Sequence, residues 1–213
     1  MRTLLVTVML VLTTMVGCKK KSDVFMFDCT VYDERVDAAV SGASVTMLVQ
    51  RADGGFNPNF EIVGSATTDA SGRFYIEVEK GVFYAYRVDV SHPTHFNESF
   101  SINPDDVPFS TAYSETFVID PKAWIATHLI NQNMSQTATF AVVANNGNCT
   151  ECCSGGNTIV QGANVDSVFI CPVYGEQQIS VAGNYVDENG GVHQIAETAY
   201  VQAFDTTTVT VIY

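Results

Sequence analysis

The sequence predicts an all-β protein built as two tandem β-sandwiches. Apolar and polar residues alternate with a period of two through most of the chain after residue 23, which is typical of strands with one buried face. Gly, Asn, Asp and Pro interrupt the alternation at short intervals, as expected for turns. No segment combines helical periodicity with capping residues. A hydrophobic content of 46% is enough for a core, so we do not expect a disordered chain.

The first sandwich is expected over residues 24–120. Its first strand, from Val24, places Cys29 on the buried face. The strand Val82–Val90 is expected to point Tyr84 and Tyr86 inward. Further strands are expected at Ala43–Gln50, Phe60–Thr68, Phe74–Glu79, Phe96–Ile102 and Ala112–Ile119.

Two segments of this half carry a family resemblance. Gly42–Thr46 reads GASVT and Thr68–Phe74 reads TDASGRF. Together they resemble the signature of carboxypeptidase regulatory-like domains. The resemblance implies a seven-stranded, transthyretin-like sandwich that serves as a noncatalytic accessory domain.

The second sandwich is expected over residues 121–213. Pro121 interrupts strand pairing and marks the boundary. About 90 residues with regular turns suit an immunoglobulin-like sandwich. Its strands are expected at Trp124–Asn131, Thr137–Asn145, Val165–Tyr174, Gln178–Asp187, Val192–Phe204 and Thr207–Tyr213.

The N-terminal segment Met1–Lys21 predicts export and lipid attachment. Arg2 precedes a short apolar run, and residues 15–18 read MVGC, which resembles a bacterial lipobox. The resemblance implies a signal peptide over residues 1–17, cleavage before Cys18, lipid on Cys18 and a tether over residues 18–23. The apolar run is too short for a membrane span, which needs about 20 residues. A plain cleaved signal peptide is the other alternative and would leave Cys18 as a free thiol.

The charge limits the partners. The chain has 10 basic and 23 acidic residues, a formal net charge of −13, and Lys19–Lys21 supply three of the basic residues. Such an acidic body repels nucleic acid, so no nucleic-acid role is expected. It is also expected to stand off an anionic bilayer. The predicted location is the outer membrane, with the periplasmic and surface faces both left open.

Four cysteines of the second half are disulfide candidates. Cys149, Cys152 and Cys153 lie in the loop 145–157, and Cys171 lies in an apolar strand. Outside the cytoplasm disulfides persist, so we expect Cys152 or Cys153 to bond to Cys171, and Cys149 to bond to the remaining loop cysteine. A zinc site is the alternative. Cys29 is expected to stay a buried thiol.

No catalytic, metal or cofactor site is expected. His92, His95 and Glu98 have metal-ligand chemistry, but a turn closed by Pro93 need not bring the two imidazoles together. The acidic loops 105–106 and 187–189 lack the spacing of a calcium loop. No triad, phosphate loop or zinc-protease motif is present.

The remaining expectation is a noncatalytic lipoprotein that binds or scaffolds at the cell envelope. Its partners would be the membrane, through Cys18, and an envelope protein or a glycan. The alternative is a glycan-binding accessory lipoprotein of a nutrient-uptake system. Trp124 opens a strand and is a poor sugar platform, although tyrosines could stack on sugars. The tripeptides 166–168 and 205–207 resemble O-glycosylation sites of Bacteroidetes, whose two-sandwich lipoproteins this chain resembles.

Overall fold

The protein is all-β, as predicted. The structure, a computed structural model, describes residues 23–52, 58–132, 137–145, 147, 149–153, 155–162 and 164–213. In this part of the chain the regular elements are strands, apart from one turn of 3-10 helix, η2 (Pro104–Asp106). No helix among these residues is long and apolar enough to cross a membrane. The predicted signal peptide and Cys18 lie outside the described residues.

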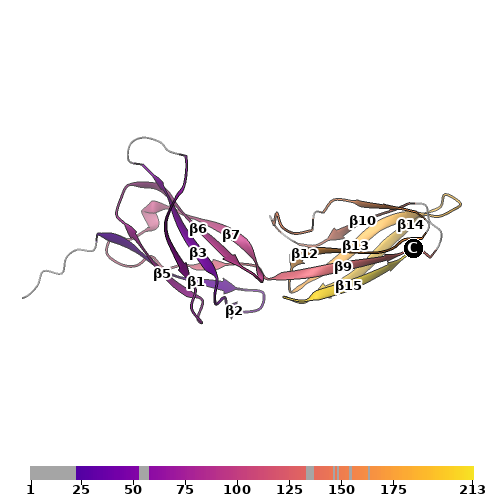
Figure 1. The fold of residues 1–213 in the computed structure, drawn as a ribbon, viewed down its shortest axis with the longest axis horizontal. Coiled ribbons are helices and arrows are strands. Elements are labelled where there is room, and N and C mark those ends of the chain that lie inside the picture. Colours follow the sequence, from indigo (N-terminus) through magenta and orange to yellow (C-terminus); the bar gives the residue numbers. More distant parts are fainter. Residues whose placement is uncertain are drawn as a thin grey trace, which may run out of the picture.

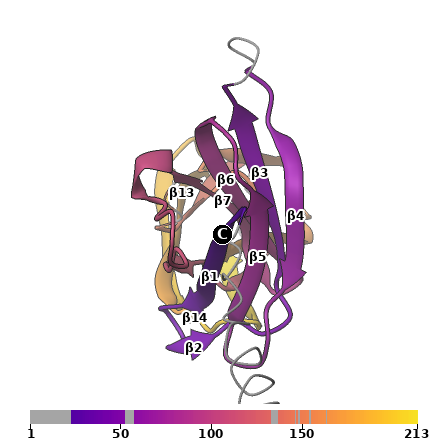
Figure 2. The same cartoon turned by 90° about the vertical axis from the view of Figure 1, so that its left-hand side faces the viewer.

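The first half of the chain forms a sandwich of two sheets (Figure 1). In one sheet β1 pairs with β5, in parallel with β8, and at its end with β2; the other has the order β4-β3-β6-β7. Figure 2 looks along the molecule onto this sandwich. The strands are β1 (Val24–Asp33), β2 (Ala38–Ala39), β3 (Ser44–Arg51), β4 (Glu61–Thr67), β5 (Arg73–Glu79), β6 (Phe83–His92), β7 (His95–Ile102) and β8 (Thr116–Val118).

The second half forms another sandwich, of four strands facing three. Its sheets have the orders β11-β10-β13-β14 and β12-β9-β15, with β15 parallel to β9. Four strands opposite three is also the arrangement of an immunoglobulin constant-type sandwich. The strands are β9 (Lys122–Ile130), β10 (Thr137–Val143), β11 (Thr158–Gln161), β12 (Asp166–Tyr174), β13 (Gln177–Val186), β14 (Val192–Val201) and β15 (Thr206–Ile212).

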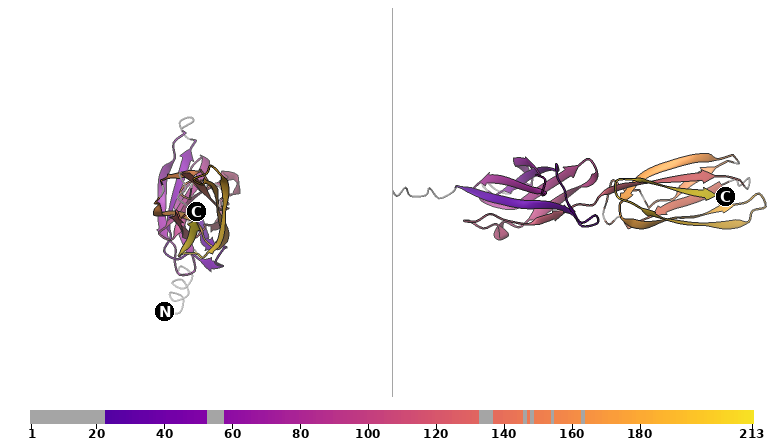
Figure 3. Two further views of the ribbon diagram at one scale, coloured as in Figure 1. Left: turned by 90° about the vertical axis from the view of Figure 1, so that its right-hand side faces the viewer. Right: turned by 90° about the horizontal axis from the view of Figure 1, so that it is seen from below.

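The two sandwiches lie end to end and form a rod. β1 begins at the end of the rod remote from the second sandwich, and the C-terminus lies at the opposite end (Figures 1 and 3). Each sandwich has its own hydrophobic cluster: one draws its buried members from residues 25–119, the other from residues 123–213. Whether each half folds alone, as the predicted boundary at Pro121 implies, stays a prediction.

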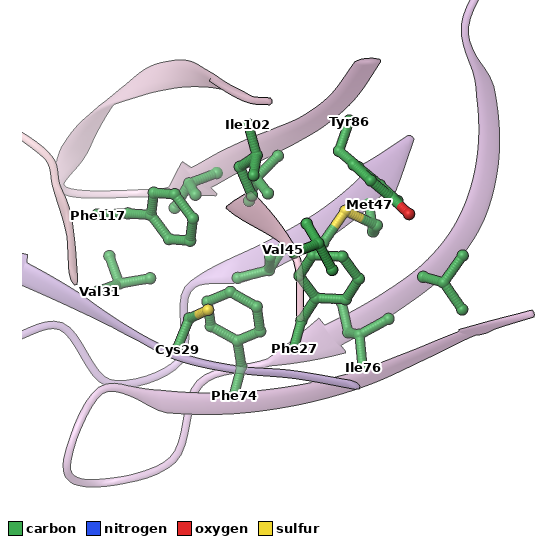
Figure 4. Close-up of a cluster of buried hydrophobic side chains, with 14 of the residues drawn as sticks. Phe27, Cys29, Val31, Val45, Met47, Phe74, Ile76, Tyr86, Ile102 and Phe117 are labelled. Atoms are coloured by element: carbon green, nitrogen blue, oxygen red, sulfur yellow. The ribbon is translucent and has the colours of Figure 1, made fainter. Parts of the chain in front are cut away.

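The core of the first sandwich follows from the alternation in the sequence. Every second residue of β1 from Phe25 to Val31 is buried, and the residues between are half-buried. These side chains meet the inward faces of β3 and β6, where Met47 and Tyr86 are buried (Figure 4). Burying each large apolar side chain contributes about 1.5–3 kcal/mol, which makes this face the main source of stability.

The residues that resemble the carboxypeptidase regulatory-like signature, Gly42–Thr46 and Thr68–Phe74, have structural roles. The buried Thr68 hydroxyl donates to the Val40 carbonyl, 2.7 Å away, and accepts from the Ala43 amide, 2.8 Å away. Asp69 Oδ1 accepts from backbone amides of the following turn. Gly72 has φ +73°, and a Cβ there would lie 2.4 Å from the Val31 carbonyl oxygen. The motif therefore closes a turn against β1 and supplies no reactive group.

One inward assignment was wrong. Tyr84 is 50% exposed, and Phe83 takes the buried position. The pairing of β3 with β6 shifts between Gln50 and Arg51, so that Arg51 lies opposite Phe83. A bulge of this kind changes which face the following residues point to. A strict two-residue alternation over Val82–Val90 does not allow for this shift.

The other differences concern element ends. The segment expected as a strand over Ala112–Ile119 forms a ladder only at β8, although Tyr113 makes an isolated parallel bridge with Phe27. The strand expected to reach Phe204 ends as β14 at Val201, because Phe204 adopts φ +65° in a turn. The short strands β2 and β11 were not expected; they are too brief to show a period.

Candidate binding site at the junction of the sandwiches

Backbone hydrogen bonds fix the connection between the sandwiches. The amide of Lys122, the first residue of β9, donates to the Thr94 carbonyl, 2.8 Å away, and the Lys122 carbonyl accepts from the Phe204 amide, 2.7 Å away. The carbonyl of Pro121 accepts from the Gly175 amide at 2.9 Å. The connecting residues therefore contact turns from both halves.

A buried hydrogen-bonded pair, Asp33 and His95, lies beside this connection. Asp33 ends β1 and is fully buried, and His95 begins β7 with 5% of its surface exposed. His95 Nε2 lies 3.0 Å from Asp33 Oδ2, while Asp33 Oδ1 accepts from the amides of Arg35 and Val36 at 2.8 and 3.2 Å. The carboxylate thus has partners on both oxygens, as a buried charge requires.

Two further groups engage the other nitrogen of His95. Its Nδ1 lies 3.0 Å from Nδ1 of His92 and 3.1 Å from the hydroxyl of Thr94. The turn therefore brings the two imidazoles together, which the sequence argument had not expected. With both ring nitrogens engaged, His95 has no free nitrogen to act as a general base in this conformation.

The pKa of His95 is lowered. Burial of the ring is the largest cause, because it disfavours the charged form, and the neighbouring His92 acts in the same direction. The charges of Asp33 and Asp120 and the hydrogen bond to Asp33 oppose the shift. We infer that desolvation prevails and that the neutral ring is the resting form.

Glu98 does not join the histidines. Burial raises its pKa, and the negative charges of Asp120 and Glu151 add to the rise. Among the described residues, no three His, Cys, Asp or Glu side chains form a group that could hold a metal ion.

Side chains of the two sandwiches also meet directly. Arg35 forms an ion pair with Asp120 within the first sandwich, and its guanidinium lies 5.0 Å from the centre of the Tyr174 ring of the second. Phe96 packs edge-on against the same ring, with centroids 5.1 Å apart. Phe204 reaches across to His95, with ring centroids 5.3 Å apart. Its left-handed backbone is unusual for an aromatic residue and places the ring at this contact.

The cysteine loop lies against the same junction. Disulfides join Cys149 to Cys152 and Cys153 to Cys171, which confirms the expectation of disulfides among these four residues. The Cys153 amide also donates to the Pro172 carbonyl, 2.7 Å away, which ties the loop to β12.

Glu151, between the two disulfides, reaches the first sandwich. One of its oxygens lies 3.2 Å from the Lys122 amine, and the other accepts from the Asn97 side-chain amide at 3.1 Å. A cavity of about 620 Å³ lies along the loop, lined among others by Val142, Asn145, Cys149, Thr150 and Cys153. A second, of about 260 Å³, lies between the loop and β7. The arrangement offers a fixed polar surface with hollows, which suits binding.

The other residues singled out from the sequence lie apart from this surface. Cys29 is the free cysteine of the described residues and is buried, and burial raises its pKa to about 11. His128 pairs with Asp166 at 2.6 Å, and His193 pairs with Asp187 at 2.8 Å. In the two tripeptides that resemble O-glycosylation sites, the central residue lies in a strand: Ser167 is in β12, and Thr206 is the first residue of β15.

Sequence reasoning did not identify Asp33, Arg35 or Glu151 as junction residues. Their types are common in exposed turns, and no local pattern announces a partner that lies far along the chain. The one usable signal is that Asp33 directly follows the alternating residues of the strand that begins at Val24.

The fold and the junction define a class: an all-β protein of two tandem sandwiches with a disulfide-closed loop where they meet. No protein family and no curated protein matches this sequence. Among solved structures it is similar to a streptococcal ancillary pilin, at 13% identity and a TM-score of 0.37, over 91% of this chain and 63% of the pilin.

Two further structures show similarity at the same level. A 9R-lipoxygenase from Cyanothece is 14% identical with a TM-score of 0.34, over 50% of this chain and 18% of the enzyme. The shaft pilin SpaA from Lactobacillus rhamnosus GG is 8% identical with a TM-score of 0.35, over 89% of this chain and 97% of the pilin. At these scores the similarities support no conclusion about the function of this chain.

Proposed function

We propose that this chain is a noncatalytic lipoprotein of the cell envelope, anchored in the outer membrane through Cys18, that binds or scaffolds a partner through the cysteine loop at the junction. We assign the first sandwich to the carboxypeptidase regulatory-like type on the two motif segments. The lipobox-like residues 15–18 support the anchor.

The observation that carries the binding role is the pair of disulfides around Glu151. Cys153–Cys171 closes a separation of 18 residues and Cys149–Cys152 one of 3. A loop ordered before its partner arrives avoids the entropy loss that a free loop would suffer on binding. The disulfides also suit a compartment outside the cytoplasm, where such bonds persist.

The anchor is tested first. Replacing Cys18 with Ser is expected to abolish labelling by a fatty-acid analogue and to release the protein from the membrane fraction or leave the precursor uncleaved. Labelling that persists in Cys18→Ser would contradict the anchor. Protease treatment of intact cells then shows whether the body faces the surface or the periplasm.

The loop is tested in living cells with a photo-crosslinking amino acid. Placed at Thr150, it is expected to give a discrete adduct of higher mass; placed at Tyr84, which is also exposed but lies on the first sandwich, it is expected to give none. Absence of an adduct from Thr150 would contradict binding through the loop.

The second candidate function is glycan binding, and the hollows beside the loop favour it. Asn145 and Thr150 supply polar groups there, as sugar sites require. A glycan array with the folded body decides this: binding to one glycan class that is lost on removing the Cys149–Cys152 disulfide would support it, and an array without signal would leave a protein partner.

A further inference from the structure

The first sandwich has an apolar end at the point where the described chain begins. β1 runs from Val24 to Asp33 at the junction, so its first residue lies about 30 Å from the junction. Figures 1 and 3 show the same arrangement, with β1 starting at the end of the rod remote from the second sandwich.

Two exposed hydrophobic side chains belong to this end. Phe109 is 73% exposed and Val82 is 69% exposed. The Phe109 carbonyl accepts from the Lys80 amine at 3.1 Å, and the Lys80 amide donates to the Asp23 carbonyl at 2.9 Å. Val82 follows Lys80 by two positions in the turn between β5 and β6. Single exposed apolar residues are ordinary, but these two lie on neighbouring loops beside the start of β1.

The chain length limits how far this end can be from a bilayer. Cys18 and Asp23 are five residues apart. Even fully extended, that segment spans at most about 18 Å. With lipid on Cys18, the end that holds Asp23 therefore stays within that distance of the headgroups, whatever the rest of the rod does.

The local chemistry suits a bilayer surface. Phe109 packs on Phe25 with ring centroids 5.6 Å apart, and the Lys80 amine lies 5.7 Å from the centre of the Phe25 ring. Aromatic rings with a neighbouring lysine are typical of the membrane interface, where the ring enters the headgroup layer and the amine stays hydrated. Asp105 and Asp106 in η2 are acidic, so the fit is to zwitterionic lipid.

We propose that Phe109 and Val82 form a lipid-contacting end that rests on the zwitterionic surface of the bilayer holding the anchor. The inference depends on the proposed lipid at Cys18. It revises the expectation from net charge that the whole body stands off the membrane, because exposed apolar side chains lie at this end beside its acidic residues. The rod would then stand upright and hold the junction site about 30 Å above the headgroups.

The test places tryptophan at this end of the full-length acylated protein in phosphatidylcholine vesicles. The native Trp124 lies in β9 at the junction and gives the baseline. In vesicles that contain brominated phosphatidylcholine, the emission added by Phe109→Trp or by Val82→Trp is expected to be strongly quenched. The matched control is Ile212→Trp, which adds an exposed ring at the far end of the rod and is expected to stay unquenched.

Mass spectrometry of the same samples separates the two hypotheses. If Cys18 is acylated and the rings at positions 109 and 82 are quenched no more than the ring at 212, the lipid-contacting end is overturned while the anchor stands. If Cys18 carries no acyl group, the proposed anchor fails and this inference fails with it. Circular dichroism of each variant confirms that the sandwiches are intact.

Discussion

The Asp33–His95 pair has two roles at the scale of single residues. It satisfies two polar groups that β1 and β7 bury, and it fixes the orientation of the turn that receives the connection to β9. Leaving a buried partner unsatisfied costs about 1–3 kcal/mol. The pair therefore stabilises the first sandwich and also holds the turn that contacts the second.

The lowered pKa of His95 predicts a loss of stability on mild acidification. The unfolded chain binds a proton near the ordinary value of 6.5, whereas the folded protein does so only at lower pH. The contribution of His95 to the free energy of unfolding is therefore fully present above pH 6.5. It is lost as the pH falls from 6.5 toward the folded pKa. Glu98, with its raised pKa, acts in the opposite direction as the pH approaches its own range.

A comparison of variants isolates this contribution. In urea titrations between pH 7 and 5, His95→Gln is expected to show a shallower dependence of unfolding free energy on pH than the wild type. Equal slopes for wild type and His95→Gln would contradict the assignment.

The partners of these residues show where sequence reasoning ends. Alternation placed Phe25 and Cys29 on the buried face correctly, because the two-residue period is a local property of the strand. His95 and Asp33 are separated by 62 positions, and their contact depends on how the sheets are stacked. A single sequence contains no signal for that stacking.

At the scale of elements, the cysteine loop depends on its two cross-links to different degrees. Closing the longer loop, Cys153 to Cys171, stabilises by about 3 kcal/mol through loop-closure entropy, whereas the Cys149–Cys152 loop contributes about 2 kcal/mol. Cys153 and Cys171 also pack against the core of the second sandwich, which adds to the difference.

Paired alanine variants test this order. The double variant Cys153→Ala with Cys171→Ala is expected to lower the midpoint of thermal unfolding more than the double variant Cys149→Ala with Cys152→Ala. The second pair serves as the control, since it removes the same number of sulfur atoms. Peptide mapping without reducing agent that finds four free thiols would contradict both disulfides.

The sequence located most strands but not all of their ends. Long alternating segments such as β13 were found within one residue of their bounds. Errors arose where geometry departs from simple alternation: at the bulge opposite Phe83 and at the left-handed Phe204. Of the candidate site, the cysteines could be found because thiols have one dominant chemistry outside the cytoplasm, while Glu151 and Arg35 could not.

At the scale of the whole molecule, the two separate hydrophobic clusters predict halves that fold alone. The contacts between them are a few hydrogen bonds, the Arg35 guanidinium over the Tyr174 ring and aromatic packing around Tyr174, rather than a shared core. The fragments 22–120 and 121–213 are each expected to unfold cooperatively in urea. If 22–120 shows no cooperative transition, the junction is an obligatory interface and the predicted boundary is wrong.

The parallel pairing of β9 with β15 has a consequence for how the protein is made. These are the first and last strands of the second sandwich, and Trp124 lies opposite Thr206, about 80 positions later. Closing so long a loop costs entropy before any pairing is gained, which slows folding. As the chain emerges from a ribosome or an export channel, the first sandwich already has all its strands. The second has to wait for β15, so β9 keeps an open edge until Thr206–Ile212 are out.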